Sequence, residues 1–175
     1  MPTSRRPSGR TADPVLKLLR TMLRVGRIAE PAGAAPAPTA DPAAPTPTGS
    51  VQIRHVDAGS CNGCEIELGA AFGPVYDAER YGARLVASPR HADAIVVTGP
   101  VTRNLAEPLR ITFEAMPAPR RVVAIGDCAR NCGAFAGAYG VVGAVSDVVP
   151  VDLEVPGCPP RPEDVVAALR ELTGR

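Results

Sequence analysis

The sequence has little of what several classes of protein depend on. Tryptophan is absent and aromatic residues make up only 3% of the 175 residues, so platforms for stacking nucleic-acid bases are scarce. The formal net charge is +1, which argues against a general polyanion-binding protein. No stretch approaches the ~18–20 apolar residues that a membrane-spanning helix needs. No G-x-G-x-x-G pattern follows a predicted strand, which weighs against a flavin- or nucleotide-binding function.

Charge is unevenly distributed along the chain. Residues 1–30 hold seven basic and two acidic residues, whereas the remainder has a net charge of −4. Asp13 and Pro14 predict a helix start, with aspartate as the N-cap and proline at the first helical position. From Val15 to Ile28, apolar and basic residues fall on opposite sides at helical spacing. Such a helix docks on a partner protein, lies on an anionic membrane surface or packs on its own domain, and we favour the first.

Composition divides the chain into four segments. We expect residues 1–12 to be disordered and residues 13–30 to form the basic amphipathic helix. Six prolines and seven alanines fill residues 31–48, so we expect residues 31–49 to be a semi-extended linker. The compact domain is then expected over residues 50–172.

Strand-like and helix-like segments alternate within that domain. Strands are predicted at residues 51–56, 84–87, 94–98, 121–125 and 151–155, and helices at residues 65–72, 102–115 (with Thr102 as N-cap) and 163–172. This alternation predicts an α/β fold with right-handed crossovers and a mainly parallel sheet.

Four of the five cysteines lie in loops that follow predicted strands. Cys61 and Cys64 follow the first strand as a C-x-x-C pair, and Cys128 and Cys158 follow two later strands. Because the carboxyl ends of parallel strands share one edge of a sheet, these cysteines should converge there. The sequence has no convincing secretory signal, so a reducing, cytoplasmic compartment is expected, where grouped cysteines bind metal or do redox chemistry.

Four thiolates select zinc or an iron–sulfur cluster. One pair plus two distant single cysteines is unlike a zinc ribbon, and Pro159 directly after Cys158 is typical of iron–sulfur proteins. The pattern therefore favours a [4Fe–4S] cluster, with a zinc-stabilised interaction module as the alternative. Cys132 competes with Cys128 as a ligand, and Cys128 is preferred because it sits in the strand-end turn. The two histidines, His55 and His91, lack ligand spacing and are expected to be structural.

An ordered set of motifs resembles a known family. The set comprises Cys61-Asn62-Gly63-Cys64 with Glu67, Gly126-Asp127-Cys128, Tyr139-Gly140-Val141-Val142, Pro150-Val151-Asp152 and Pro156-Gly157-Cys158-Pro159-Pro160. Together they resemble the small electron-transfer protein shared by complex I (the B-type subunit of NADH-quinone oxidoreductase) and membrane-bound group 4 [NiFe] hydrogenases, including formate hydrogenlyase. The resemblance covers residues 50–172.

The resemblance implies a flavodoxin-like three-layer domain that carries one [4Fe–4S] cluster. Its ligands would be Cys61, Cys64, Cys128 and Cys158, while Cys132 stands where the family usually has a glycine. Glu67, and less so Glu65, would assist proton movement at the interface, or else simply favour a helix N-terminus.

The same resemblance implies a subunit of an oxidoreductase rather than an autonomous enzyme. Its partners would be a large catalytic subunit, of the [NiFe] type or the 49-kDa type of complex I, other iron–sulfur subunits and, through residues 13–30, membrane-arm subunits. No nucleic acid is expected as a partner. The complex would sit on the cytoplasmic, inner face of the cell membrane. C-x-x-C at Cys61 and Cys64 is typical of the hydrogenase branch, and a quinone-reducing complex I subunit is the alternative.

Overall fold

The computed structural model describes residues 14–25 and 49–175. The chain divides into two units, residues 1–37 and residues 38–175. In the first unit the structure describes helix α1, Pro14–Val25, which begins at the predicted proline. Three predictions lie partly or wholly outside the described residues. They are the disorder over residues 1–12, the ends of the predicted helix at residues 13 and 26–30, and the linker up to residue 48. None of the helices in the two described ranges is long and apolar enough to cross a membrane.

The second unit is organised around a sheet of five parallel strands. These are β1 (Val51–Asp57), β2 (Ala83–Leu85), β3 (Ala94–Thr98), β5 (Arg121–Ile125) and β7 (Leu153–Val155). Their order across the sheet is β2-β1-β3-β5-β7, and each neighbouring pair is parallel. This is the order 2-1-3-4-5 of flavodoxin-like folds, in which ligands bind beyond the carboxyl ends of the strands. The predicted α/β, flavodoxin-like class is confirmed.

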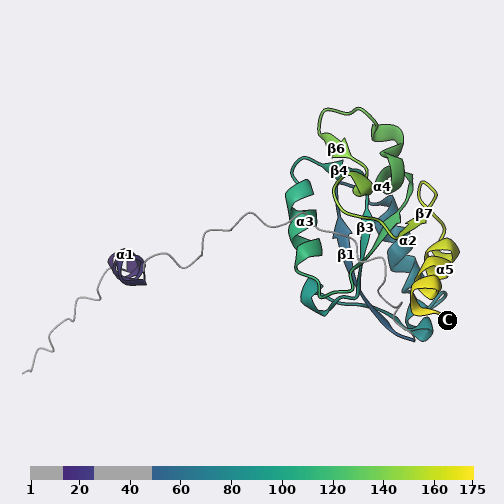
Figure 1. The fold of residues 1–175 in the computed structure, drawn as a ribbon, viewed down its shortest axis with the longest axis horizontal. Helices are drawn as coiled ribbons and strands as arrows, with labels where there is room; N and C mark the ends of the chain where they lie inside the picture. The colour runs from purple at the N-terminus through teal and green to yellow at the C-terminus, as the bar shows by residue number, and fades with distance from the viewer. Residues whose placement is uncertain (1–13, 26–48) are drawn as a thin grey trace, which may run out of the picture. The chain divides into compact units, whose positions relative to one another are not determined.

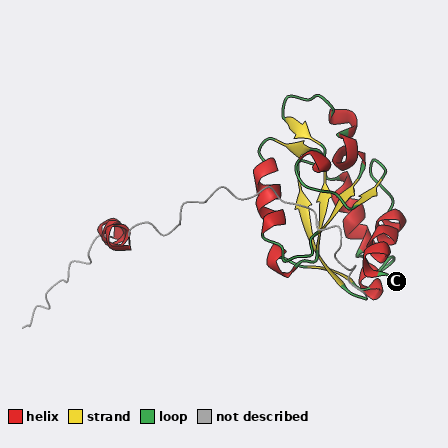
Figure 2. Ribbon diagram, viewed as in Figure 1, coloured by secondary structure: helices red, strands yellow, loops and turns green. Residues whose placement is uncertain are grey.

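Helices cover both faces of this sheet and give three layers (Figures 1 and 2). Helices α2 (Gly63–Ala71) and α5 (Pro162–Thr173) lie on one face, and α3 (Ala106–Glu114) lies on the other. All five residues of β3 are buried, because a central parallel strand is covered on both faces. Alternate side chains of β3 accordingly enter the two hydrophobic cores, as expected for the two-residue period of a strand.

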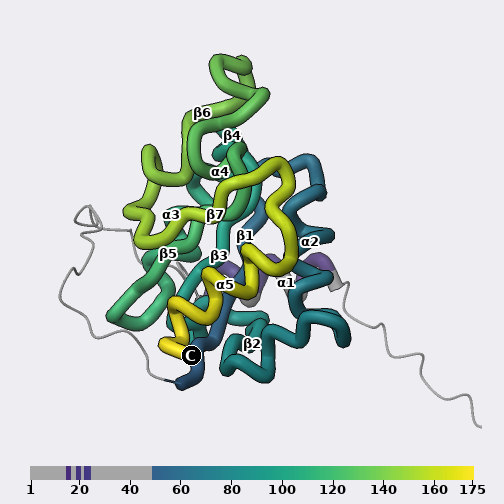
Figure 3. Tube along the Cα trace, turned by 90° about the vertical axis from the view of Figure 1, so that its right-hand side faces the viewer, coloured from purple at the N-terminus to yellow at the C-terminus, as the bar shows by residue number. Residues whose placement is uncertain are grey.

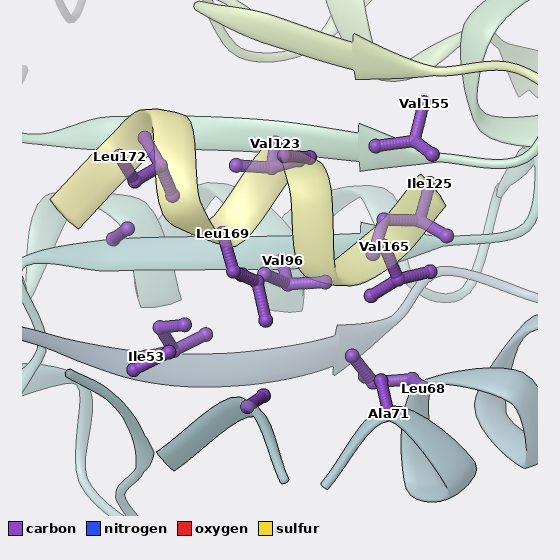
Figure 4. Close-up of a cluster of buried hydrophobic side chains, with 14 of the residues drawn as sticks. Ile53, Leu68, Ala71, Val96, Val123, Ile125, Val155, Val165, Leu169 and Leu172 are labelled. Carbon is purple, nitrogen blue, oxygen red and sulfur yellow. The ribbon is translucent and has the colours of Figure 1, made fainter. Parts of the chain in front are cut away.

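The larger core lies between the sheet and helices α2 and α5 (Figure 4). Leu169 and Val165 of α5 pack there against strand residues such as Val96 and Val123. Leu68 of α2 closes the same cluster. This packing fixes the start of α2 beside the end of β1, where the C-x-x-C pair lies.

The helix predicted from Thr102 to Ala115 is wrong at its start. Val101–Thr102 forms a short strand, β4, that pairs antiparallel with β6, Val141–Gly143. The backbone N–H of Thr102 donates to the carbonyl of Ala58 over 2.9 Å, and its hydroxyl donates to the same oxygen over 3.2 Å. These long-range bonds hold Thr102 extended, so the helix begins only at Ala106.

The short second sheet lies at the same end of the domain as α4, Asp127–Asn131 (Figure 3). Neither the sheet nor α4 is predicted from the sequence, because each element is too short to show periodicity. Four 3₁₀ helices complete the described elements: Ala78–Tyr81, Pro89–His91, Gly133–Phe135 and Val145–Asp147.

Candidate metal centre

Four cysteines from three distant loops line one cavity of about 130 Å³ at the carboxyl edge of the sheet. They are Cys61, Cys64, Cys128 and Cys158. A single water molecule needs about 10–15 Å³ of such space, so the cavity is roughly tenfold larger. The structure therefore brings together the four sulfurs that the sequence singles out, although almost a hundred residues separate the first from the last.

The four thiols differ in depth. Cys64 and Cys128 are buried, each with 8% of its surface exposed, whereas Cys61 and Cys158 are exposed. The buried pair belongs to the first turns of α2 and α4, whereas Cys61 lies in the loop before α2 and Cys158 in the loop between β7 and α5. The cavity is thus open to the protein surface on the side of Cys61 and Cys158.

Asp57 shapes the loop that carries Cys61. Its Oδ1 atom accepts hydrogen bonds from the backbone N–H groups of Gly59 and Ser60, each over 2.8 Å. The hydroxyl oxygen of Ser60 accepts a bond from the N–H of Asn62 over 2.9 Å. Asn62 has a left-handed backbone, with φ of 72°, a conformation that asparagine tolerates better than most residues. These turns lead the chain from β1 through Cys61 into α2.

Asp127 joins the loops that carry Cys128 and Cys158. Its N–H donates to the carbonyl of Gly157 over 2.8 Å, and the N–H of Gly157 donates to its Oδ1 atom over 3.0 Å. Arg130 donates to the same carboxylate oxygen over 3.2 Å and to Glu154 over 2.9 Å. This reciprocal pairing sets the spacing between the two loops. In the sequence, the pairing is indicated only by the Gly-Asp-Cys motif at residues 126–128.

Gly126 allows Cys64 to approach the neighbouring loop. Its φ is 89°, and a Cβ at this position would lie 2.6 Å from the sulfur of Cys64. Any other residue would both strain this backbone and fill the space that the sulfur occupies. A glycine between β5 and Cys128 is therefore a requirement of the site and not only of the turn.

The two buried thiols hold their protons strongly. Burial raises the pKa of Cys64 to about 12, with further increases from the charges of Glu65, Cys128, Cys61 and Cys158. Burial also raises the pKa of Cys128, together with the nearby thiols of Cys158 and Cys61. Four thiolates crowded around one cavity repel each other, so a cationic group is needed to hold them all deprotonated.

Four cysteine thiols around one cavity are a donor set that suits a thiophilic metal ion or an iron–sulfur cluster. The four ligands of a zinc ion lie about 2.3 Å from one point. Among the residues that the structure describes, no three Cys, His, Asp or Glu side chains are arranged to hold one metal ion. All four thiols line the same cavity, so a group of that size held there could be bound through each of them.

Cys132 is not among the residues that line this cavity. It ends α4 with a left-handed backbone, φ 66°, and is half-buried. Burial and the charge of Asp147 raise its pKa, so its thiol is near an acidic side chain outside the cysteine group. The geometry therefore separates Cys128, which lines the cavity, from Cys132, which does not.

The acidic residues of α2 have different surroundings. Glu67 is half-buried and does not line the cavity. The pKa of Tyr76 is raised by burial, by Glu163 and, to a smaller extent, by the charge of Glu67. The role of Glu67 in proton movement stays a prediction. Glu65 instead accepts a hydrogen bond from the hydroxyl of Thr98, whose oxygen is 2.9 Å from Nε2 of His55. Sequence reasoning missed this group, because the pairing of β1 with β3 and the placement of α2 against the sheet bring its members together.

A parallel α/β sheet with a cysteine-lined cavity at its carboxyl edge is the arrangement of a domain that binds a metal or a cluster. The chain belongs to the family described as "NADH ubiquinone oxidoreductase, 20 Kd subunit", which it matches over residues 61–172. This match confirms the resemblance seen in the motifs. It includes all four cysteines that line the cavity.

Relatives from both branches of the family are similar to the chain. A probable membrane-bound hydrogenase subunit of Pyrococcus furiosus is 49% identical over 124 residues, covering 69% of this chain and 74% of the relative. A B-type subunit of NADH-quinone oxidoreductase from Herpetosiphon aurantiacus is 46% identical over 110 residues, covering 62% of this chain and 61% of the relative. These relatives are subunits of oxidoreductase complexes, and so is this protein.

A solved structure has the same fold. A chain of the membrane-bound sulfane sulfur reductase, an archaeal respiratory membrane complex, superposes with a TM-score of 0.64 and 34% sequence identity. The match covers 73% of this chain and 70% of the solved chain.

Proposed function

We propose that this protein is an electron-transfer subunit that carries one [4Fe–4S] cluster. Cys61, Cys64, Cys128 and Cys158 would be its ligands. The cluster would pass single electrons to or from the large catalytic subunit of a membrane-associated hydrogenase or complex I-type oxidoreductase. The observation that carries this proposal is the single cavity lined by all four cysteines, in a chain that belongs to this family.

The size of the cysteine-lined cavity favours a cluster over zinc. The four cysteines line a cavity of about 130 Å³, which leaves more room than a single zinc ion held about 2.3 Å from each sulfur would need. The cluster, when bound, supplies one-electron chemistry. The chain contributes the thiol ligands, a partly buried cavity and backbone loops that approach the sulfurs closely.

The open side of the cavity supports the proposed partner. Cys61 and Cys158 are exposed, so a cluster held there would lie at the surface of this subunit. Covering that surface with a large subunit would exclude water and shorten the path for electrons. Other iron–sulfur subunits of the complex would exchange electrons with this assembly of the large subunit and the present protein.

The C-x-x-C spacing of Cys61 and Cys64 favours the hydrogenase branch. The second candidate is the complex I counterpart, which passes electrons toward quinone. It is supported by the Herpetosiphon aurantiacus relative, whose identity of 46% is close to the 49% of the hydrogenase relative. The large subunit that copurifies with this protein distinguishes the two, since nickel is expected only with a partner of the [NiFe] type.

Helix α1 is the proposed attachment to the membrane side of the complex. Leu19, Met22 and Leu23 expose apolar side chains, and the exposed Arg20 and Arg24 add positive charge. This combination suits an acidic, apolar-lined groove on a membrane-arm subunit. The complex would then lie on the inner face of the cell membrane.

Removal of residues 1–30 tests this attachment. The shortened protein is expected to keep its iron, because the cysteine cavity lies in the other unit, but to lose most of its recovery with isolated membranes. The double variant Arg20→Ala with Arg24→Ala removes two positive charges and keeps the apolar side chains, so its recovery with membranes shows how much of the attachment depends on charge. Unchanged recovery of the shortened protein with membranes would refute the role of α1.

Anaerobic purification of the complex tests the cluster. We expect a brown protein with about four iron atoms and four sulfides per copy of this chain, and an electron paramagnetic resonance signal on reduction. A colourless protein with one zinc ion would refute the cluster and support the zinc-stabilised interaction module.

A further inference from the structure

Three polar side chains form a connected group beside the cysteine cavity. His55 lies on β1, Thr98 ends β3, and Glu65 follows Cys64 on α2. Thr98 is fully buried, and the side chains of Glu65 and His55 are 17% and 26% exposed. Gly99, the residue after Thr98, lines the cavity. The group therefore lies directly behind the wall that carries Cys64.

The hydrogen-bond directions in this group are fixed by the donors available. The single hydroxyl proton of Thr98 is donated to Oε1 of Glu65, so its oxygen accepts from Nε2 of His55. Burial lowers the pKa of His55, against the opposing influence of Glu65 and Asp57. A neutral imidazole protonated at Nε2 satisfies both observations. His55 then positions Thr98 without contributing a positive charge.

The negative charge of Glu65 is left uncompensated by its surroundings. Its Oε2 atom is buried and has no hydrogen-bond partner among the described residues. No lysine or arginine among the described residues forms an ion pair with Glu65. Nε2 of the neutral His55 ring is 3.8 Å from Oε1 of Glu65. A charge in such a partly buried position acts on its neighbours far more strongly than a charge in water.

We propose that the fixed charge of Glu65, held in place by Thr98 and His55, lowers the reduction potential of the cluster bound by the four cysteines. The proposal rests on the proposed function. Reduction adds one electron, supplied by the donor of the complex, to an already anionic group. A neighbouring carboxylate makes that addition less favourable. Glu65 ligates nothing in this scheme and is a positioning residue whose charge acts through space.

Replacing Glu65 with glutamine removes the charge and keeps the shape of the side chain. We expect the ratio of reduced to oxidised cluster at a fixed ambient potential to rise about tenfold, which is about 59 mV for a one-electron couple. The measurement is a redox titration of the anaerobically purified complex, followed by electron paramagnetic resonance. Glu163→Gln is the matched control, because Glu163 also lies in the first turn of a helix and accepts a bond from a hydroxyl, that of Tyr76. Neither glutamate lines the cavity, but Glu65 directly follows Cys64, whereas Glu163 lines a separate pocket with Tyr76.

Five outcomes are informative. A higher reduction potential in Glu65→Gln, with no shift in Glu163→Gln, supports the proposal, and a lower one overturns it. Equal potentials in wild type and Glu65→Gln, or equal shifts in both variants, overturn it. Loss of iron from Glu65→Gln also overturns it, since that result would make Glu65 a structural requirement rather than a source of charge. Absence of iron from the wild-type complex refutes the proposed function itself, and iron analysis shows this before any titration begins.

Discussion

Replacing Cys128 with serine is expected to abolish cluster binding, whereas replacing Cys132 with glycine should leave it intact. Cys128 lines the cavity and Cys132 does not, although only three residues separate them. A serine hydroxyl is a harder ligand than a thiolate and ionises far less readily, so it is a poor substitute for binding iron. The iron content of Cys128→Ser should fall from about four atoms to near zero per chain.

Cys132→Gly is the matched control for this loss. Cys132 has φ of 66°, which glycine adopts without strain, so the variant should stay within about 1 kcal/mol of wild-type stability. Both variants are purified anaerobically, and their iron and sulfide contents and visible spectra are compared. Iron retained by Cys128→Ser, with iron lost from Cys132→Gly, would show that the ligand set has been misassigned.

Replacing Gly126 with alanine is expected to destabilise the domain by at least about 2 kcal/mol and to weaken cluster retention. The added Cβ would lie 2.6 Å from the sulfur of Cys64 and would occupy a backbone with φ of 89°. Both effects act at once, because the strained turn and the displaced sulfur belong to the same site. Chemical denaturation under anaerobic conditions measures the free energy of unfolding, and iron content measures cluster retention.

Gly69→Ala is the control for this substitution. Gly69 lies inside α2, and an added Cβ would meet no atom within 4 Å. Alanine is preferred over glycine in a helix, so this variant should gain roughly 0.5–1 kcal/mol and keep its iron. Equal behaviour of the two alanine variants would contradict the steric role given to Gly126.

The large-scale features of the protein could be predicted because they rest on local patterns. Buried parallel strands such as 94–98 and 121–125 are continuous apolar runs, and the structure has them at the predicted residues. Shorter elements could not be predicted in the same way. Thr102 has ordinary helix-start chemistry, yet its bonds to Ala58, more than forty residues away, hold it in a strand.

The sequence by itself determined the fold class, the family and the four cysteines in question, because strand periodicity and motif spacing are written in consecutive residues. Only the tertiary structure decided which of Cys128 and Cys132 lines the cavity, and how deep each thiol lies. The pairing of β1 with β3 and the position of α2 likewise decided that His55, Thr98 and Glu65 meet. Contacts of this kind depend on how separate segments pack, and no local pattern specifies them.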